Sequence, residues 1–217
     1  MRVLAVCAVP READALRGLS NASIIIGGVG RTNAAMATTR ALIEGGSFDA
    51  VLSLGIAGAL PFDGDPLKPG DVVLATESVY HEEGLITPDS FLDTSQMGFP
   101  LGDFEGNNIP GSPALIERFD GIGVPGRVAT VATCSGSDAA ASQVVRRTGA
   151  IAEAMEGAAV LHVASAFSCP AVELRVISNT TGERDAQVWA LDEAFSVLHG
   201  LVPELDARLQ DGWGLTP

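Results

Sequence analysis

The chain has 217 residues, of which 47% are hydrophobic and 18% charged, and its formal net charge at pH 7 is −14. This length is typical of one globular domain with a sizeable core. The negative charge argues against nucleic acid and anionic membrane surfaces as partners, because both require clustered positive charge. No apolar run reaches the roughly 18–20 residues of a membrane span.

Short β-branched segments alternate with alanine-rich segments along the chain. In chain order, the sequence predicts a strand over 3–9, a helix over 10–17, a strand over 22–28, a helix over 31–46, strands over 50–56, 71–80 and 126–133, a helix over 138–149, a strand over 150–154, a helix over 156–167, a strand over 171–178 and a helix over 189–211. This alternation favours a three-layer α/β fold with a largely parallel sheet. We expect a single domain over residues 1–217.

One segment departs from this rhythm. Residues 81–112 show little periodicity, although loops longer than about 12–15 residues are uncommon in compact domains. The segment contains Phe91, Phe99 and Phe104 and is too apolar for plain disorder. We therefore expect a lid over a site or a contact between subunits.

Two glycine motifs follow predicted strands. In IIIGGVGRTNAA (24–35), Gly28 and Gly30 resemble a dinucleotide-binding turn, but Asn33 replaces the third glycine and no acidic residue completes the pattern. We interpret the motif as a tight turn. In LGIAGAL (54–60), the glycines suit either a close approach of backbone to a ligand or a plain turn. This stretch has no Arg, Lys, Ser or Thr that could hold a phosphate.

Glu12 and Glu156 are candidate site residues because of where they lie along the chain. Each is at the start of a predicted helix, where the helix dipole stabilises an acid, so capping alone would explain either one. Glu12 also follows the first strand, at the end of the sheet where open α/β proteins bind ligands. Glu156 repeats this situation beside Met155.

The sequence gives no sign of a metal or cofactor site. His81 has no second histidine at a metal-binding spacing. Cys7, Cys134 and Cys169 share no ligand spacing either, which predicts reduced thiols in a cytoplasmic protein.

The sequence motifs described above, taken together with VISNTTGERD, occur in an order that resembles a known superfamily. AVPREADAL, GGVGRTNAA, LGIAGAL, EAMEGAAVLHVA and VISNTTGERD follow one another as in the nucleoside phosphorylase/nucleosidase superfamily. The resemblance covers nearly the whole chain and is closest to the hydrolytic branch that includes methylthioadenosine/S-adenosylhomocysteine nucleosidases. Within that branch the chain looks most like the futalosine hydrolases, which belong to menaquinone biosynthesis. The resemblance implies a three-layer αβα sandwich with a twisted mixed sheet, no metal or organic cofactor, and a homodimer or higher homo-oligomer.

The resemblance also implies roles for particular residues. Cleavage of a purine N-glycosidic bond passes through an oxocarbenium-like sugar and a departing purine anion, so an enzyme must activate a nucleophile, hold the ribose and neutralise the base. Glu12 matches the carboxylate that activates water. Glu156 matches the acid that binds the ribose hydroxyls, with Met155 beneath the sugar, and Arg175 matches an arginine near the sugar.

Water is favoured over phosphate as the nucleophile. A phosphorylase binds phosphate with cationic and hydroxyl donors, but Ile56 and Ala57 stand where such donors would be needed. The carboxylate of Glu12 would in addition repel phosphate.

Asn179 bears on the identity of the base. The resemblance implies an aspartate at this position in adenine-releasing nucleosidases, which can protonate N7. An amide cannot deliver a proton, but it can donate to a 6-oxo group and accept from a protonated N7. Asn179 therefore favours a 6-oxopurine nucleoside such as futalosine, which contains hypoxanthine. The alternative, that Asn179 is a turn residue in NTTG, stays open.

Asp185, in the same loop, is a candidate to shuttle a proton to N7. Three other functions are considered: an adenine-releasing nucleosidase with an unusual Asn, a purine nucleoside phosphorylase, and a nucleoside-binding protein without catalysis. The presence of both Glu12 and Glu156 argues against the last. The futalosine hypothesis further predicts an apolar surface for the carboxyphenyl tail, supplied by residues 81–112 or by a neighbouring subunit.

Overall fold

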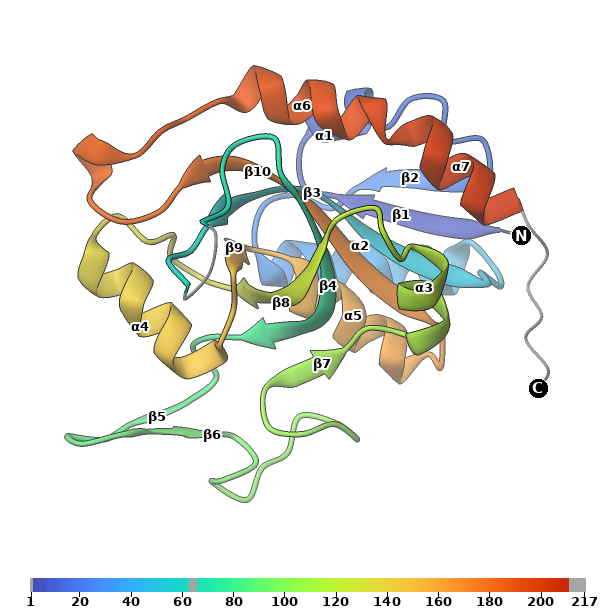
Figure 1. Cartoon of the computed structure of the whole chain (residues 1–217). Helices are drawn as coiled ribbons and strands as arrows, with labels where there is room; N and C mark the ends of the chain where they lie inside the picture. Colours follow the sequence, from blue (N-terminus) through green and yellow to red (C-terminus); the bar gives the residue numbers. More distant parts are fainter. Residues whose placement is uncertain (1, 63–65, 211–217) are drawn as a thin grey trace.

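The computed structural model describes residues 2–62 and 66–210, and its centre is a mixed sheet (Figure 1). The strands are β1 (Val3–Cys7), β2 (Ala22–Ile26), β3 (Ala50–Ala59), β4 (Val72–Tyr80), β7 (Asn108–Pro110), β8 (Val124–Thr130), β9 (Ala152–Ala154) and β10 (Ala171–Thr180). Their order is β10–β4–β8–β9–β3–β1–β2, with β7 also on β4. Because β10 pairs with β3 as well as with β4, the sheet curls back on itself.

Helices cover both faces of this sheet. They are α1 (Pro10–Ala15), α2 (Arg31–Glu44), α3 (Pro113–Arg118), α4 (Asp138–Thr148), α5 (Gly157–Ala166), α6 (Leu191–Gly200) and α7 (Val202–Gln210), with a 3-10 turn η1 (Arg184–Ala186). Residues of α1, α6 and α7 pack on one face, and residues of α2 and α5 pack on the other (Figure 1). This confirms the predicted αβα layers. No helix within the described ranges is long and apolar enough to cross a membrane.

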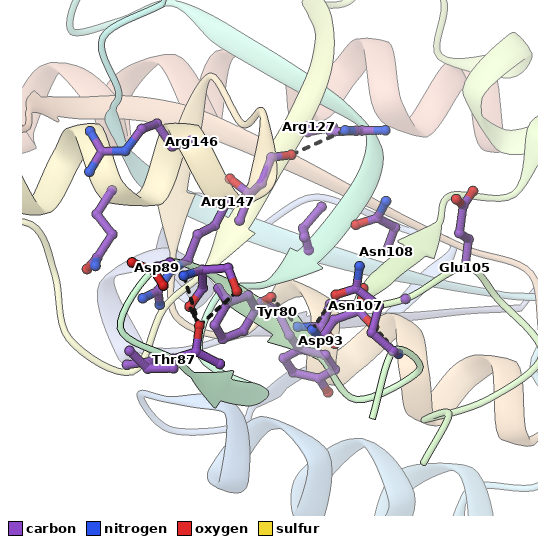
Figure 2. A pocket seen from close by; sticks show the side chains of 18 of the residues that line it. Tyr80, Thr87, Asp89, Asp93, Glu105, Asn107, Asn108, Arg127, Arg146 and Arg147 are labelled. Carbon is purple, nitrogen blue, oxygen red and sulfur yellow. Dashed lines mark hydrogen bonds between the residues drawn. The ribbon is translucent and has the colours of Figure 1, made fainter. Parts of the chain in front are cut away.

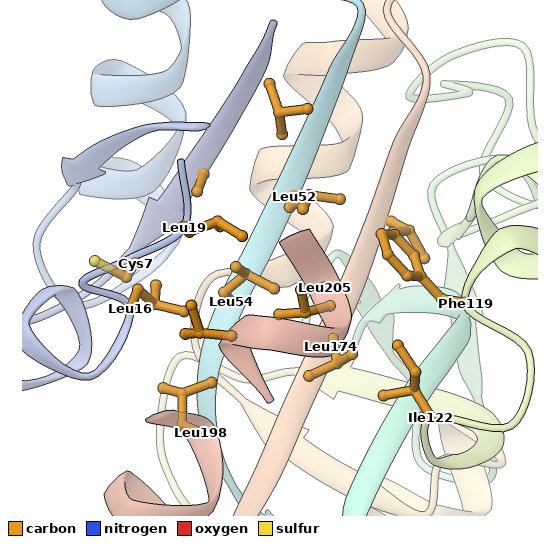
Figure 3. Close-up of a cluster of buried hydrophobic side chains, with 14 of the residues drawn as sticks. Cys7, Leu16, Leu19, Leu52, Leu54, Phe119, Ile122, Leu174, Leu198 and Leu205 are labelled. Carbon is orange, nitrogen blue, oxygen red and sulfur yellow. The ribbon is translucent and has the colours of Figure 1, made fainter. Parts of the chain in front are cut away.

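The alternation of side chains along β3 divides the core between the two faces. Leu52 and Leu54 lie in one buried cluster with Leu174 of β10 and Leu198 of α6 (Figure 3). Val51 belongs to the opposite cluster, under α2 and α5, because successive strand residues face opposite sides of a sheet. Ser53 and Gly55 follow on the face of Val51, and their small size leaves room there for polar groups.

Three elements differ from the sequence expectation. Of the two interpretations of LGIAGAL, the plain turn is wrong: β3 continues through the stretch to Ala59, because β10 and β9 pair with it on either side. The helix predicted over 189–211 is two helices, α6 and α7, and residue 211 lies outside the described residues. Residues 113–118, for which no element was predicted, form α3, which opens on Pro113.

Residues 81–112 contain a two-stranded hairpin of β5 (Gly84–Ile86) and β6 (Phe91–Asp93), which extends away from the main sheet (Figure 1). The ring of Phe91 lies 4.4 Å from the guanidinium of Arg147, and Phe104 packs edge-on against His162. Phe99 is 71% exposed. The segment is therefore anchored to the fold by β7, which pairs with β4, and by two aromatic side chains, and it keeps exposed apolar groups.

Candidate active site

Glu12 lies in the first turn of α1, directly after β1, and is 2% exposed. Its Oε2 accepts hydrogen bonds from the backbone N–H groups of Ala8 (2.7 Å) and Val9 (3.1 Å). Its Oε1 accepts from the N–H of Ile56 in β3 (3.0 Å). The carboxylate thus caps α1 and at the same time lies against the central strand of the sheet.

Glu156 directly precedes α5, but its side chain bonds elsewhere. Its Oε1 accepts a hydrogen bond from the backbone N–H of Gly30 (3.0 Å), at the start of α2. Gly30 has φ +90°, a conformation that glycine adopts without steric cost. The GGVG turn therefore presents a backbone donor to the carboxylate of Glu156, which accounts for the glycine without a dinucleotide.

Arg175 connects the buried carboxylates. Its Nε donates to Oε1 of Glu173 (2.8 Å), its Nη2 donates to Oγ of Ser53 (3.1 Å), and the same Nη2 lies 3.5 Å from Oε2 of Glu156. Burial lowers the pKa of Arg175, but Glu173, Glu156 and Glu12 outweigh burial and raise that pKa above its ordinary value. The guanidinium is therefore charged, and its partners offset the cost of burying it.

Gly55 explains how Glu12 and Arg175 come together. A methyl group at this position would lie 2.3 Å from Oε1 of Glu12 and 2.5 Å from Nη1 of Arg175. Both side chains thus occupy the space above a residue without a side chain. Three carboxylates, those of Glu12, Glu156 and Glu173, surround one guanidinium, so the cluster can stabilise positive charge that develops on a bound group.

Asn179 is re-aimed by an irregularity in β10. The register between β10 and β3 shifts between Ile177 and Asn179, so that Ile177 faces Ala57 while Asn179 faces Gly58. The extra residue, Ser178, donates through Oγ to Oδ1 of Asn179 (2.9 Å), and Nδ2 of Asn179 donates to the carbonyl of Thr180 (2.9 Å). Such bulges change the direction of the next side chain.

The amide of Asn179 lines a cavity of about 280 Å³. The cavity is lined by Gly58, Cys134, Ser135, Gly136, Glu153, Asn179, Arg184, Gln187 and Trp189. Trp189 is 48% exposed and is bridged through its backbone to Asn179, and its ring lies 4.8 Å from the guanidinium of Arg184. A glycine floor beside an exposed indole suits a planar heterocycle, because aromatic faces stack on such ligands.

Glu153 of β9 was not singled out from the sequence. It is 4% exposed, and Ser135 donates to both of its oxygens, through the backbone N–H (2.7 Å) and through Oγ (2.6 Å). Burial raises the pKa of Glu153, and the two bonds from Ser135 partly offset that effect. The signal that could have found it is a single acid inside the apolar strand AIAEA.

Cys134 lines the same cavity. Burial raises the pKa of its thiol, and so do the charges of Glu153 and of Glu156. Glu156 follows Glu153 by three residues, so the short segment after β9 connects the cavity to the carboxylate cluster.

The remaining predicted site residues lie around the same region, with one exception. Met155 is half-buried next to Glu156, Ile56 is half-buried, and Ala57 is buried, with its carbonyl 3.1 Å from Oγ of Ser178 as an alternative acceptor to Asn179. Asp185 is exposed in η1 and is not among the residues that line the cavity, although its neighbour Arg184 is.

A second cavity, of about 730 Å³, lies beneath the β5–β6 hairpin (Figure 2). Arg127, Arg146 and Arg147 line it, and so do three carboxylates, those of Asp89, Asp93 and Glu105. Since Arg127 is also paired with Glu77 at 2.6 Å, the charges here are balanced and do not single out an anionic ligand. Throughout the described part of the chain, no group of three His, Cys, Asp or Glu side chains is arranged to hold a metal ion.

Comparison with known proteins gives consistent matches. The family model of the phosphorylase superfamily matches residues 10–202. A futalosine hydrolase from Streptomyces coelicolor is 34% identical over 197 residues, which cover 88% of this chain and 80% of the relative. A 5'-methylthioadenosine/S-adenosylhomocysteine nucleosidase from Chromohalobacter salexigens is 30% identical over 177 residues, covering 74% of this chain and 67% of the relative. The structure of a futalosine hydrolase mutant from Helicobacter pylori strain 26695 has a TM-score of 0.74 at 21% identity, covering 95% of this chain and 99% of that one, and shows the same fold.

Proposed function

The chain belongs to the phosphorylase superfamily, and we propose that it is an N-glycosyl hydrolase that cleaves futalosine with water and releases hypoxanthine. The observation that carries this proposal is the amide of Asn179, which lines a cavity together with the buried carboxylate of Glu153 in a relative of the futalosine hydrolases. The enzyme would belong to menaquinone biosynthesis in the cytoplasm. Its three cysteines are unpaired, in keeping with a reducing compartment.

Glu12 is proposed to orient and activate the attacking water. Its carboxylate is held by three backbone donors, those of Ala8, Val9 and Ile56, so its position is fixed before substrate binds. Neither Ile56 nor Ala57 offers a hydroxyl or a cation to a phosphate ion. Water is therefore the nucleophile that this arrangement suits.

Glu156 is proposed to bind the ribose hydroxyls, with Met155 beneath the sugar. Gly30 fixes one oxygen of Glu156, and Arg175 lies beside the other. Arg175 is buried behind these carboxylates, so we assign it the role of a positioning residue that acts on the sugar through Glu156 and Glu12. The excess of negative charge in the cluster stabilises the oxocarbenium-like sugar as the bond breaks.

Asn179 is proposed to bind the base. Oδ1 of the amide accepts one hydrogen bond, from Ser178, and Nδ2 donates one, to Thr180, whereas an amide has two donors and two acceptor lone pairs. One N–H thus stays available for the 6-oxo oxygen, and one lone pair for a protonated N7. Asp185 is proposed to bring that proton, by way of water, because its own side chain is exposed in η1.

A homo-oligomer is proposed from the exposed apolar side chains. Met36 and Ile43 of α2 are 65% and 66% exposed, and Ile86 and Phe99 of the segment 81–112 are 70% and 71% exposed. Exposed apolar groups of this size commonly mark contacts between subunits. Analytical ultracentrifugation of the wild type and of a Met36→Glu/Ile43→Glu variant tests this, and a wild-type monomer would contradict it.

An adenine-releasing nucleosidase is the second candidate, favoured by the relative from Chromohalobacter salexigens. Futalosine hydrolysis and adenine release are distinguished by assaying base release in phosphate-free buffer with futalosine, inosine and 5'-methylthioadenosine. Hypoxanthine from futalosine is the expected result, and a Glu12→Gln protein purified in parallel controls for contaminating nucleosidases. Adenine from methylthioadenosine would support the second candidate. Turnover only after phosphate is added would indicate a phosphorylase, and no turnover at all a binding protein.

A further inference from the structure

Glu173 of β10 is fully buried, and each oxygen of its carboxylate accepts a side-chain hydrogen bond. Its Oε1 accepts from Nε of Arg175 (2.8 Å), two residues along the same strand. Since side chains alternate along a strand, Glu173 and Arg175 share one face of the sheet. Its Oε2 accepts from Oγ of Ser78 in the neighbouring strand β4, and Ser78 is also fully buried. The carboxylate is therefore held by donors from two strands.

The carboxylate of Glu173 also lies against the first residue of α5. A methyl group at Gly157 would overlap both carboxylate oxygens and the carboxyl carbon, so only a glycine leaves the space that Glu173 occupies. Gly157 directly follows Glu156 and begins α5, where the helix dipole stabilises negative charge. Glu173 therefore contacts the backbone next to Glu156 as well as the arginine beside the side chain of Glu156.

Neutralisation of Arg175 does not by itself account for Glu173. Burial lowers the pKa of Arg175, and all three carboxylates around it raise that pKa, but Glu12 and Glu156 alone already outnumber the single guanidinium. Glu173 nevertheless makes the shorter contact, 2.8 Å to Nε, whereas Oε2 of Glu156 lies 3.5 Å from Nη2. A charge-assisted hydrogen bond at about 2.8 Å is strong and directional. Glu173 thus fixes the guanidinium from inside the sheet and leaves the charge of Glu156 available to another donor.

We propose that Glu173 is a positioning residue that aims Glu156 at the ribose hydroxyls. It acts by two routes, through the guanidinium of Arg175 and through the backbone at Gly157. This inference rests on the proposed function, because it concerns the acid that is proposed there to bind the ribose. Glu156 has the N–H of Gly30 on one oxygen and a guanidinium of fixed orientation beside the other. Its carboxylate is therefore in place before the sugar binds, which lowers the entropic cost of binding.

The position of Glu156 matters most as the glycosidic bond breaks. Positive charge then develops on the sugar, and a carboxylate that is already in place stabilises this charge without reorganising. A displacement of such a group by about 1 Å can cost about 100-fold in rate. Glu173 does not contact the substrate, so its effect reaches the sugar only through Glu156. The effect of a change at Glu173 should therefore depend on the hydroxyls that Glu156 binds.

The test is Glu173→Gln, assayed with futalosine and with 2′-deoxyfutalosine, which lacks one of the hydroxyls assigned to Glu156. Glutamine can still accept from Nε of Arg175, but without its charge it holds the guanidinium less firmly. We expect kcat/KM for futalosine to fall about 10- to 100-fold, mainly through kcat. For the deoxy substrate it should fall at most about threefold, because two changes in one chain of contacts are not additive.

Glu77→Gln is the matched control. Glu77 is also a strand glutamate paired with a strand arginine, Arg127 at 2.6 Å, but it is not one of the carboxylates around Arg175. Its replacement should leave both kcat/KM values unchanged. Ser78→Ala takes the place of Glu173→Gln if the latter does not fold, since it removes the donor to Oε2 and keeps the charge. For Ser78→Ala we expect kcat/KM for futalosine to fall about tenfold.

Equal losses on futalosine and on the deoxy substrate would mean that Glu173 only stabilises the fold, and they overturn the inference. Wild-type kcat/KM in the folded variant overturns it as well. If the wild type cleaves inosine or methylthioadenosine instead of futalosine, the same comparison is made with that nucleoside and its 2′-deoxy counterpart, so the inference is decided separately from the identity of the base. A wild type that cleaves none of the three nucleosides overturns the proposed function and this inference together.

Discussion

The guanidinium Nη2 of Arg175 lies 3.5 Å from Oε2 of Glu156, and the two side chains are only 2% and 9% exposed. The same guanidinium bonds to Glu173, whose second oxygen accepts from Oγ of Ser78. Arg175 thus connects Glu156, which is proposed to bind the sugar, to the buried carboxylate of Glu173. We therefore expect a change at Arg175 to affect both the stability of the fold and the activity.

Replacing Arg175 by methionine should therefore damage the fold as well as the site. The change leaves Glu173 and Glu156 buried without their cation, and breaking a buried pair in this way costs about 3–5 kcal/mol. Calorimetric unfolding should show Tm lowered by about 10 °C. Arg11→Met is the control: Arg11 pairs with Asp192 at 2.6 Å, but both are exposed, so its loss should cost at most about 1 kcal/mol. Equal losses in the two variants would contradict this account.

Gly55→Ala should reduce turnover more than it reduces binding of the base. The added methyl group meets Oε1 of Glu12 at 2.3 Å and Nη1 of Arg175 at 2.5 Å, so one of them must move. Misplacement of a catalytic group by about 1 Å can cost about 100-fold in rate. We expect kcat for futalosine to fall by about that factor while hypoxanthine affinity changes little. Gly200→Ala, where nothing lies within 4 Å of the new methyl, should keep full activity.

Asn179→Asp should change which base is released. A carboxylate cannot donate to a 6-oxo oxygen, so kcat/KM for futalosine should fall by at least about 100-fold. Release of adenine from methylthioadenosine should rise, because an acid at this position can interact with N7 and the 6-amino group. The measurement is the ratio of the two kcat/KM values by chromatography of the bases. An unchanged ratio would mean that Asn179 only terminates β10.

Asp185→Ala tests the proton shuttle. If Asp185 relays a proton to N7, kcat for futalosine should fall by about 100-fold, the usual contribution of a general acid. Hypoxanthine affinity should stay the same, because Asp185 does not line the cavity. Unchanged turnover would remove Asp185 from the mechanism.

The pH dependence of stability should report the burial of Glu153. Burial raises the pKa of Glu153 in the folded protein above its ordinary value. A raised folded pKa means that the group contributes stability fully below its unfolded pKa, and that this contribution is lost as the pH rises through the folded pKa. Glu153→Gln lacks this contribution, so Tm of the variant relative to the wild type should increase as the pH rises above about 4, the ordinary pKa of a glutamate. A constant difference across that range would show that Glu153 titrates as an exposed glutamate.

Much of the fold and part of the site could be predicted from local sequence. Alternating strand and helix segments gave the αβα layers, and the positions of Glu12 and Glu156 after a strand or before a helix marked them as candidates. For LGIAGAL, the local sequence left a turn and a close backbone approach equally possible. Its two glycines are typical of a turn, but pairing on both sides keeps it in β3, where Gly55 and Gly58 make room for the side chains of other strands.

Local sequence is sufficient to predict the order of the elements and the chemical groups that the chain carries into its site. These depend on residues that are near one another in the chain, whose propensities and patterns act locally. Tertiary pairing was needed to make Glu153 and Asn179 the two register partners of Gly58. It was also needed to bring the carboxylates of Glu12 and Glu156 to Arg175, whose other partner, Glu173, lies in the same strand. Strand register and the bulge at Ser178 fix these relationships, and both arise from pairing between distant segments, which no local pattern encodes.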